Sequence, residues 1–184
     1  MRSNVTLILR RLSLKKLFSI VLILTASAAL AQTKNPVSTV LRDMLPRQQK
    51  KLTAAVDAMP AAKFAYKPTP EQMTFAHLVM HITESNNHLC SLLGDGLASK
   101  ASELKETDTK EKLAAELQAS FDYCAQAVEK MDDSKLGDTV KGHGGDPAPR
   151  AWAAIALTND WADHYAAAAM YLRLNGILPP TAKK

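Results

Sequence analysis

Two pairs of residues in this sequence have the types and the spacing needed to bind a metal ion. His77 and His81 are four residues apart, and so are Asp160 and His164. Residues at positions i and i+4 lie on the same face of a helix, so each pair would present both side chains to one side. If the two faces meet, the imidazoles and the carboxylate converge as a set that suits a divalent transition metal such as zinc, nickel or iron.

Other polar residues lie close to these pairs or in a loop that could reach them. Asp163 and Glu84 are candidate acid–base groups, or groups that orient the ligands. His88 follows His81 by two helical turns, and His143 lies in a glycine-rich loop that could extend over the site. For each of them the alternative is an exposed side chain with no role in the site.

Four stretches of the chain carry apolar residues three or four positions apart, the spacing that predicts helices. The predicted helices cover residues 36–59, 75–93, 109–131 and 147–174. Pro46 lies inside the first stretch, where a proline should kink or divide a helix. Each predicted start carries a capping residue or a first-turn proline: Asn35-Pro36, Thr74, the capping box from Asp108 to Glu111, and Asp146-Pro147.

The fold class follows from this pattern. No segment alternates polar and apolar residues as strands do, and no internal repeat is present. Four long helices joined by short polar connections predict an all-α protein, a four-helix bundle.

The first 31 residues have the pattern of a cleavable signal peptide. Five basic residues precede an apolar run from Leu17 to Leu30, and Ala29-Leu30-Ala31 offers small residues for cleavage. The alternative is a membrane anchor, but a spanning helix needs roughly 20 apolar residues and this run is shorter. We expect a signal peptide at 1–31, one domain at 32–184, no membrane association after cleavage, and a periplasmic or secreted location.

Charge gives no indication of a nucleic-acid partner. The chain has 23 Lys and Arg against 18 Asp and Glu, and the five basic residues of the signal peptide account for the whole excess. A nucleic-acid-binding protein would be expected to carry a basic stripe with interleaved aromatic residues. The sequence is compatible with a small-molecule ligand and with a homodimer, and it decides neither.

Cys90 and Cys124 are candidates for a disulfide, because an exported protein enters an oxidising compartment. They fall in the second and third predicted helices, so a bond would link these two helices and stabilise the fold by roughly 3–4 kcal/mol. Two buried free thiols are the alternative. A catalytic cysteine is not indicated, since neither residue belongs to a C-x-x-C motif.

Two segments resemble a known family. Residues 73–85, Met-Thr-Phe-Ala-His-Leu-Val-Met-His-Ile-Thr-Glu-Ser, resemble the second-helix segment of DinB-like proteins, and His81 matches the histidine of that segment. Residues 160–165, Asp-Trp-Ala-Asp-His-Tyr, and the run from Tyr171 to Pro180 are similar to the final helix and C-terminal tail of the family, with His164 matching its last ligand. The similarity extends over essentially all of residues 32–184.

The resemblance implies a DinB-like bundle with a metal held by three side chains, commonly one histidine from the second helix and two from the fourth. The first of those fourth-helix positions is Asp160 in this sequence. The implied ligands are therefore His81, Asp160 and His164, a set of two histidines and one carboxylate that also binds transition metals. His77 is a further candidate ligand, a partner that orients the ligands, or a residue of the helix surface.

Three hypotheses about function follow. With three protein ligands a coordination position stays open, which suits a metal-dependent transferase or hydrolase acting on a small molecule. The alternative is a non-catalytic, stress-associated or binding bundle in which the metal is structural or absent. Asp160 and Ala167 fit that alternative equally well, since Asp160 stands where similar proteins commonly carry a histidine and Ala166-Ala167 stand where they often carry Gly-Gln. A helical interaction module without metal would leave His81 and His164 far apart.

Overall fold

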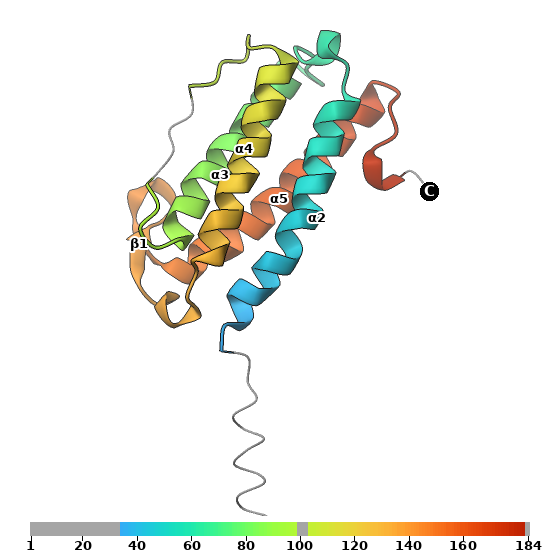
Figure 1. Cartoon of the computed structure of the whole chain (residues 1–184). Coiled ribbons are helices and arrows are strands. Elements are labelled where there is room, and N and C mark those ends of the chain that lie inside the picture. The colour runs from blue at the N-terminus through green and yellow to red at the C-terminus, as the bar shows by residue number, and fades with distance from the viewer. Residues whose placement is uncertain (1–33, 99–102, 183–184) are drawn as a thin grey trace, which may run out of the picture. The chain divides into compact units, whose positions relative to one another are not determined.

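The computed structural model describes residues 34–98 and 103–182 as a bundle of four long helices. These are α2 (Pro36–Ala58), α3 (Phe75–Leu93), α4 (Lys110–Glu129) and α5 (Arg150–Leu174), labelled in Figure 1. The predicted all-α four-helix bundle is confirmed. The predicted signal peptide at 1–31 lies outside the described residues.

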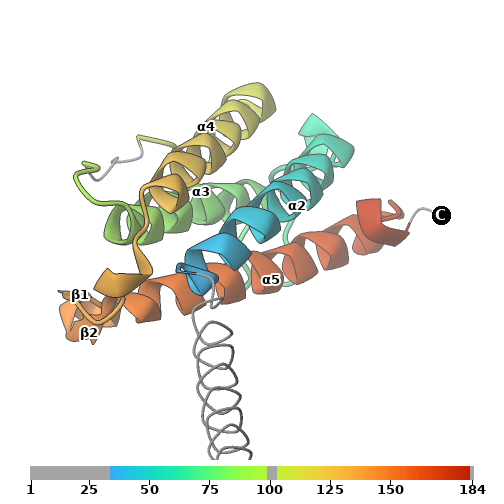
Figure 2. The ribbon, with the colours of Figure 1, turned by 60° about the horizontal axis from the view of Figure 1, so that its bottom comes forward.

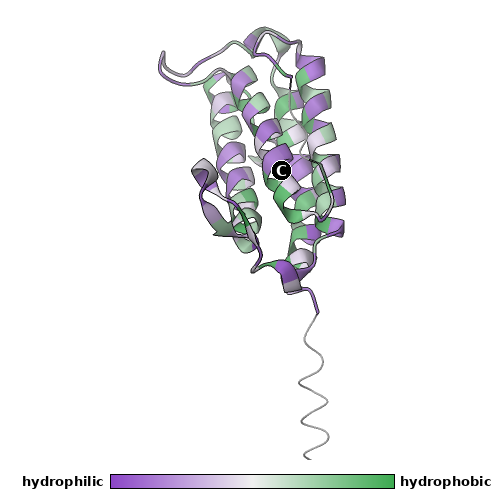
Figure 3. Cartoon of the chain, turned by 90° about the vertical axis from the view of Figure 1, so that its left-hand side faces the viewer, coloured by the Kyte–Doolittle hydropathy of each residue, from purple (hydrophilic) through white to green (hydrophobic). Residues whose placement is uncertain are grey.

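The helices pack in a cyclic order in which each has two main neighbours. α3 packs against α4 and α5, and α2 packs against the other sides of the same two helices, as Figures 1 and 2 show from two directions. Hydrophilic and hydrophobic residues both occur along the helices, as the colours of Figure 3 show. The largest side chains of the shared core, all fully buried, include Leu52, Phe75, Leu117, Phe121, Leu157 and Trp161.

The starts of α4 and α2 differ from the capping that we predicted. The N-cap of α4 is Thr109, whose hydroxyl accepts a hydrogen bond from the Lys112 backbone, whereas Asp108 accepts one from the Lys105 backbone. At α2, Asn35 makes no side-chain cap. The carboxylate of Asp133 takes this role from a distant part of the chain, because it accepts hydrogen bonds from the backbone N–H groups of Val37 and Ser38 at 2.6 and 3.0 Å.

A two-stranded antiparallel ribbon between α4 and α5 was not predicted. Strand β1 (Thr139–Lys141) pairs with β2 (Pro147–Pro149), and the 3-10 turn η4 (His143–Gly145) joins them. The prediction of a helix from 147 was therefore wrong by three residues, since α5 begins at Arg150. Pro149 explains the shift, because a proline disfavours helical geometry in the residue before it. Pro46 lies within α2, which continues past it undivided.

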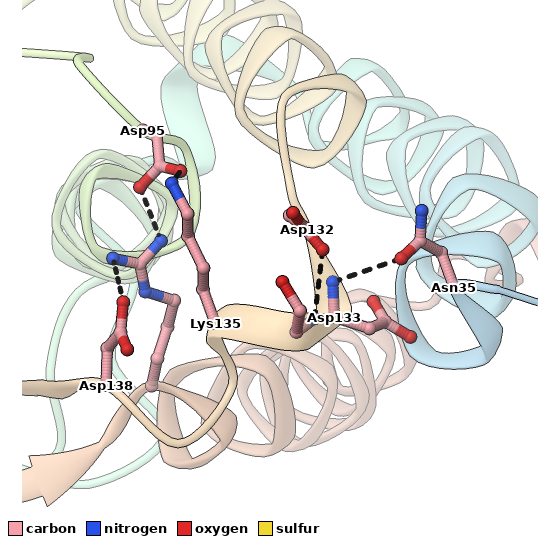
Figure 4. A network of polar contacts seen from close by, with 8 residues as sticks. Asn35, Asp95, Asp132, Asp133, Lys135 and Asp138 are labelled. Atoms are coloured by element: carbon pink, nitrogen blue, oxygen red, sulfur yellow. Dashed lines mark hydrogen bonds and ion pairs between the residues drawn. The ribbon is translucent and has the colours of Figure 1, made fainter.

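A network of charged residues connects this ribbon to the end of α3 (Figure 4). Asp95 follows α3, and its two carboxylate oxygens lie 2.5 Å from Lys135 Nζ and 2.7 Å from Arg150 Nη1. Arg150 Nη2 is also 3.6 Å from Asp138 Oδ2. The hydrogen bonds from Lys135 and then from Arg150 lower the pKa of Asp95 from 3.8 to about 2. The network therefore joins α3, the segment before the ribbon and the first residue of α5.

Cys90 and Cys124 form a disulfide that connects α3 to α4. The Cα atoms are 5.1 Å apart, and neither residue has any solvent exposure. The bond therefore lies within the core and joins two helices that are already packed together.

Among the described residues, no helix has both the length and the apolar character needed to cross a membrane.

Candidate metal centre

Three of the residues singled out in the sequence converge between α3 and α5. His81 comes from α3, and Asp160 and His164 come from successive turns of α5. One ligand atom from each residue lies within 4.8 Å of the others. The two imidazole rings are tilted by 53°, with their centres 4.8 Å apart. We call these residues the His81–Asp160–His164 triad; its donor types are those that bind transition metals.

A buried polar network fixes α5 against α3 beside the triad. Trp161 follows Asp160 in the chain, and its indole N–H donates to Asn86 Oδ1 on α3 at 2.7 Å. The amide nitrogen of Asn86 donates to Ser120 Oγ on α4 at 2.9 Å. All three side chains are fully buried, so their hydrogen bonds restrict the rotation of α5 that would move Asp160 and His164 away from His81.

The two triad residues on α5 contact each other. His164 Nδ1 lies 2.6 Å from the backbone carbonyl oxygen of Asp160 and 3.3 Å from its Oδ2. A protonated Nδ1 donating to the carbonyl would leave Nε2 as the free ring nitrogen, which is the usual arrangement in metal-binding histidines. Burial alone would lower the pKa of His164. The hydrogen bond to Asp160 and the charge of its carboxylate together have the larger effect, so the pKa of His164 is raised.

One carboxylate oxygen of Asp160 is buried without a hydrogen-bond donor in the described part of the chain. Its Oδ2 is buried and accepts no hydrogen bond from a described residue, despite the nearby His164 ring. A buried carboxylate oxygen normally has a hydrogen-bond donor or a cation as its partner. The buried oxygen without a hydrogen bond and the donor types of the triad therefore both fit a bound cation.

His77 does not join the triad, although it shares a helix with His81. Its Nδ1 lies 2.6 Å from Glu106 Oε1, and Thr74, the N-cap of α3, donates to the other oxygen of the same carboxylate. The hydrogen bond from His77 is the largest cause of a lowered pKa of Glu106. In this structure His77 thus helps to hold the loop before α4 against the start of α3, and it is not among the three converging residues.

A pocket of about 630 Å³ opens over the triad, a size that suits a small organic molecule. All three triad residues line it, together with the turn at the tip of the ribbon, residues 141–145. His88, His143 and Asp163, which the sequence suggested as neighbours of the site, also line the pocket, but Glu84 does not.

Several lining residues were not singled out in the sequence as residues of the site. Lys141 and Trp152 are two of them. The only available signal was the run of glycines from Gly142 to Gly145, which marks a turn but does not say which helices the turn approaches.

Comparison with known proteins supports the fold. The family model described as the DinB superfamily matches residues 44–168. A DinB-like protein from Bacillus subtilis superposes with a TM-score of 0.60 at 18% identity, covering 82% of this chain and 100% of the other. A DinB-like protein from Bacillus cereus ATCC 10987 gives a TM-score of 0.57 at 15% identity, covering 72% of this chain and 89% of the other. No functionally curated protein matches the chain at a significant level.

Proposed function

This chain belongs to the DinB superfamily, and from the geometry of its pocket we propose that it binds one divalent transition metal through His81, Asp160 and His164. We further propose that it acts on a small molecule in the pocket above this site, as a metal-dependent transferase or hydrolase. The donor set of two histidines and one carboxylate suits zinc, nickel or iron(II).

The observation that carries the proposal is the convergence of His81, Asp160 and His164, whose ligand atoms lie within 4.8 Å of one another. The Oδ2 atom of Asp160 is buried at this point and has only the His164 ring, 3.3 Å away, as a polar neighbour among the described residues. The 2.6 Å contact between His164 Nδ1 and the Asp160 backbone carbonyl supports the same conclusion, because it orients the His164 ring and leaves Nε2 as the nitrogen available to a metal.

The open pocket favours a catalytic centre over a structural one. A structural zinc site has four protein ligands in a closed shell, whereas only three residues converge here among those that the structure describes. When bound, a divalent cation would supply a Lewis acid that polarises a substrate carbonyl or lowers the pKa of a substrate thiol. The chain itself orients the donors, through the network from Trp161 to Ser120, and shapes the pocket.

Metal content separates this proposal from a bundle without metal. The parent protein, purified without chelators and incubated with zinc, nickel or iron(II), should hold about one equivalent per chain by elemental mass spectrometry. His81→Ala should lose it. His88→Ala is the matched control, because His88 lies on the same helix and lines the same pocket but is not in the triad. Equal metal content in the two variants, or none in the folded parent, would contradict the proposal.

We also propose that the protein is exported to the periplasm or secreted after cleavage before Gln32. The charge and apolar pattern of residues 1–31 supports this proposal, and so does the disulfide, because such bonds persist in oxidising compartments. N-terminal sequencing of the protein from a periplasmic extract should begin at Gln32. An intact N-terminus, with the protein retained in the cytoplasm, would contradict export.

A further inference from the structure

The pocket is lined by two parts of the chain that differ in chemistry. α3 and α5 supply the triad, and the tip of the ribbon supplies Lys141 and the turn that follows it. Lys141 makes no ion pair or side-chain hydrogen bond with another of the described residues. This separates it from Lys135 and Arg150 at the base of the same ribbon, which are both paired with Asp95.

The backbone at Lys141 is held in place by the tight closure of the ribbon. Gly142 N–H donates to the Asp146 carbonyl at 2.6 Å, and a Cβ atom at position 142 would come within 2.7 Å of Ala148 Cβ. At the base of the ribbon, the backbone N–H of Arg150 donates to the Asp138 carbonyl at 2.8 Å. Lys141 therefore extends from a closed ribbon that is tied to the start of α5.

The charges around the pocket leave a place for an anion. The two positive charges of the proposed cation would exceed the single negative charge of the Asp160 carboxylate that binds it. The other charged residues of the lining are Asp163 and Lys141. Asp163 is exposed, and its carboxylate offsets one positive charge. With a metal bound, the lining therefore carries a net positive charge, and Lys141 has no anionic partner within it.

We propose that the pocket accepts a small molecule that carries a carboxylate, which pairs with Lys141 while a donor atom elsewhere in the molecule reaches the His81–Asp160–His164 triad. The inference rests on the proposed metal site, and it assigns Lys141 as the residue that determines substrate charge. Lysine suits this role because its ammonium group donates up to three hydrogen bonds to a carboxylate.

Two small thiols of matched length test this assignment. The parent protein is first loaded with cobalt(II), and its cobalt content is measured. It is then titrated with 3-mercaptopropionate and with its neutral counterpart 3-mercaptopropionamide, and binding is followed by the near-ultraviolet absorption of a thiolate bound to cobalt. The parent should bind the acid roughly three- to tenfold more tightly than the amide, as expected for a charged hydrogen bond in an open pocket.

Variants of Lys141 should change this preference without changing cobalt content. Lys141→Gln should bind the two thiols equally, and Lys141→Arg, which keeps the charge, should restore the preference for the acid. Lys50→Gln is the matched control, since Lys50 is an exposed lysine of α2 outside the pocket, and it should behave as the parent does.

The possible failures are distinguishable. A folded parent that takes up no cobalt overturns the proposed metal site and this inference together. Cobalt uptake without thiol binding, or with equal binding of acid and amide, overturns only the role of Lys141. A preference that persists in Lys141→Gln overturns it as well.

Discussion

Asp160 is the residue in which the folding and the proposed chemistry of this protein conflict. Leaving a buried carboxylate oxygen without a hydrogen-bond donor costs on the order of 1–3 kcal/mol, and more when the group is charged. The oxygen is nevertheless buried beside two imidazoles, between helices held together by the fully buried Asn86 and Trp161. A cation bound by the triad would remove this cost.

Metal should therefore stabilise the fold through Asp160. A ligand at about 100 times its Kd adds about 2.7 kcal/mol to the free energy of unfolding, which raises the Tm of a domain of this size by about 5–10 °C. We expect this rise when zinc is added to the metal-free parent and followed by differential scanning fluorimetry. It should be absent in Asp160→Asn.

Asp163→Asn is the control for that measurement. Asp163 is on the same helix and lines the same pocket, but it is not one of the three converging residues. If the zinc-dependent rise in Tm is lost in Asp163→Asn and kept in Asp160→Asn, the metal is bound by Asp163 and our assignment of Asp160 is wrong.

The ribbon between α4 and α5 depends on one carboxylate at its base. The Asp95 carboxylate forms ion pairs with Lys135 and Arg150. Arg150 is the first residue of α5, the helix that carries Asp160 and His164. Loss of the Asp95 charge would thus loosen the start of α5 and the ribbon that supplies Lys141, while the triad lies several turns farther along.

The contribution of Asp95 should depend on pH in a defined window. In the unfolded chain its carboxyl titrates near 3.8, and in the folded protein its pKa is about 2. Because the folded-state pKa is the lower one, the stabilisation is fully present above about pH 4 and is lost as the pH falls towards 2. Asp95→Asn should lower Tm by a few degrees at pH 7 and by progressively less between pH 4 and 2.

Asp138→Asn provides the comparison for Asp95. Its contact with Arg150 is 3.6 Å long, against 2.7 Å for Asp95, so its removal should lower Tm less. A pH-independent effect of Asp95→Asn would show that the side chain contributes by packing and not by charge.

The packing of α3 on α4 requires a glycine at the end of α3. A Cβ atom at Gly94 would lie 2.7 Å from the Cα atom of Ala127 on α4. We expect Gly94→Ala to reduce the free energy of unfolding by about 1–3 kcal/mol, measured by urea denaturation, because the two helices would have to separate. Gly137→Ala, where no atom lies within 4 Å of the added Cβ, should change it little.

The helices were the part of the fold that the sequence predicted best. Periodic apolar residues defined α2 and α3 almost to the residue, because Pro36, Thr74 and Gly94 mark their ends by local chemistry. Capping by Asp133 could not be predicted, since it acts on a helix start that lies 95 residues and more away in the sequence. The ribbon was missed because its strands are only three residues long and β2 contains two prolines, so neither strand leaves an alternating pattern in the sequence.

For the site, the helical spacing and the family resemblance together predicted the three residues that converge. Spacing places Asp160 and His164 on one face of α5, but it does not say which helix that face meets. The resemblance supplied His81 as their partner on α3, and it did not include the ribbon. Lys141 lines the pocket because the ribbon brings it beside the triad helices, and Trp152 lines it from the first turn of α5.

Across the whole molecule, the cross-links join different pairs of helices. The disulfide joins α3 to α4, whereas a metal held by the triad would join α3 to α5. α2 takes part in neither; it is held by apolar packing, by the hydrogen bonds of Asp133 to its first turn, and by polar contacts with α4 such as Arg42 with Glu129. With metal bound, α3 would take part in both links, so its position should persist when either one is removed.

Removal of the disulfide should have a large effect on stability and a small effect on the site. The bond closes a loop of 34 residues, for which the chain-entropy model gives about 3–4 kcal/mol. The Cys90→Ala, Cys124→Ala double variant should lose about this much free energy of unfolding in urea, and it should still bind metal. Loss of metal binding in a variant that remains folded would show that the disulfide positions His81.

The two tryptophans of the chain lie in contrasting surroundings. Trp161 is fully buried and hydrogen-bonded to Asn86, next to Asp160 in the chain, whereas Trp152 is partly exposed and lines the pocket. Their fluorescence should therefore be separable, with external quenchers such as iodide acting on Trp152 and leaving Trp161 unaffected. A molecule that enters the pocket would shield Trp152 from the quencher, so the protein carries its own optical probe of pocket occupancy and needs no added label.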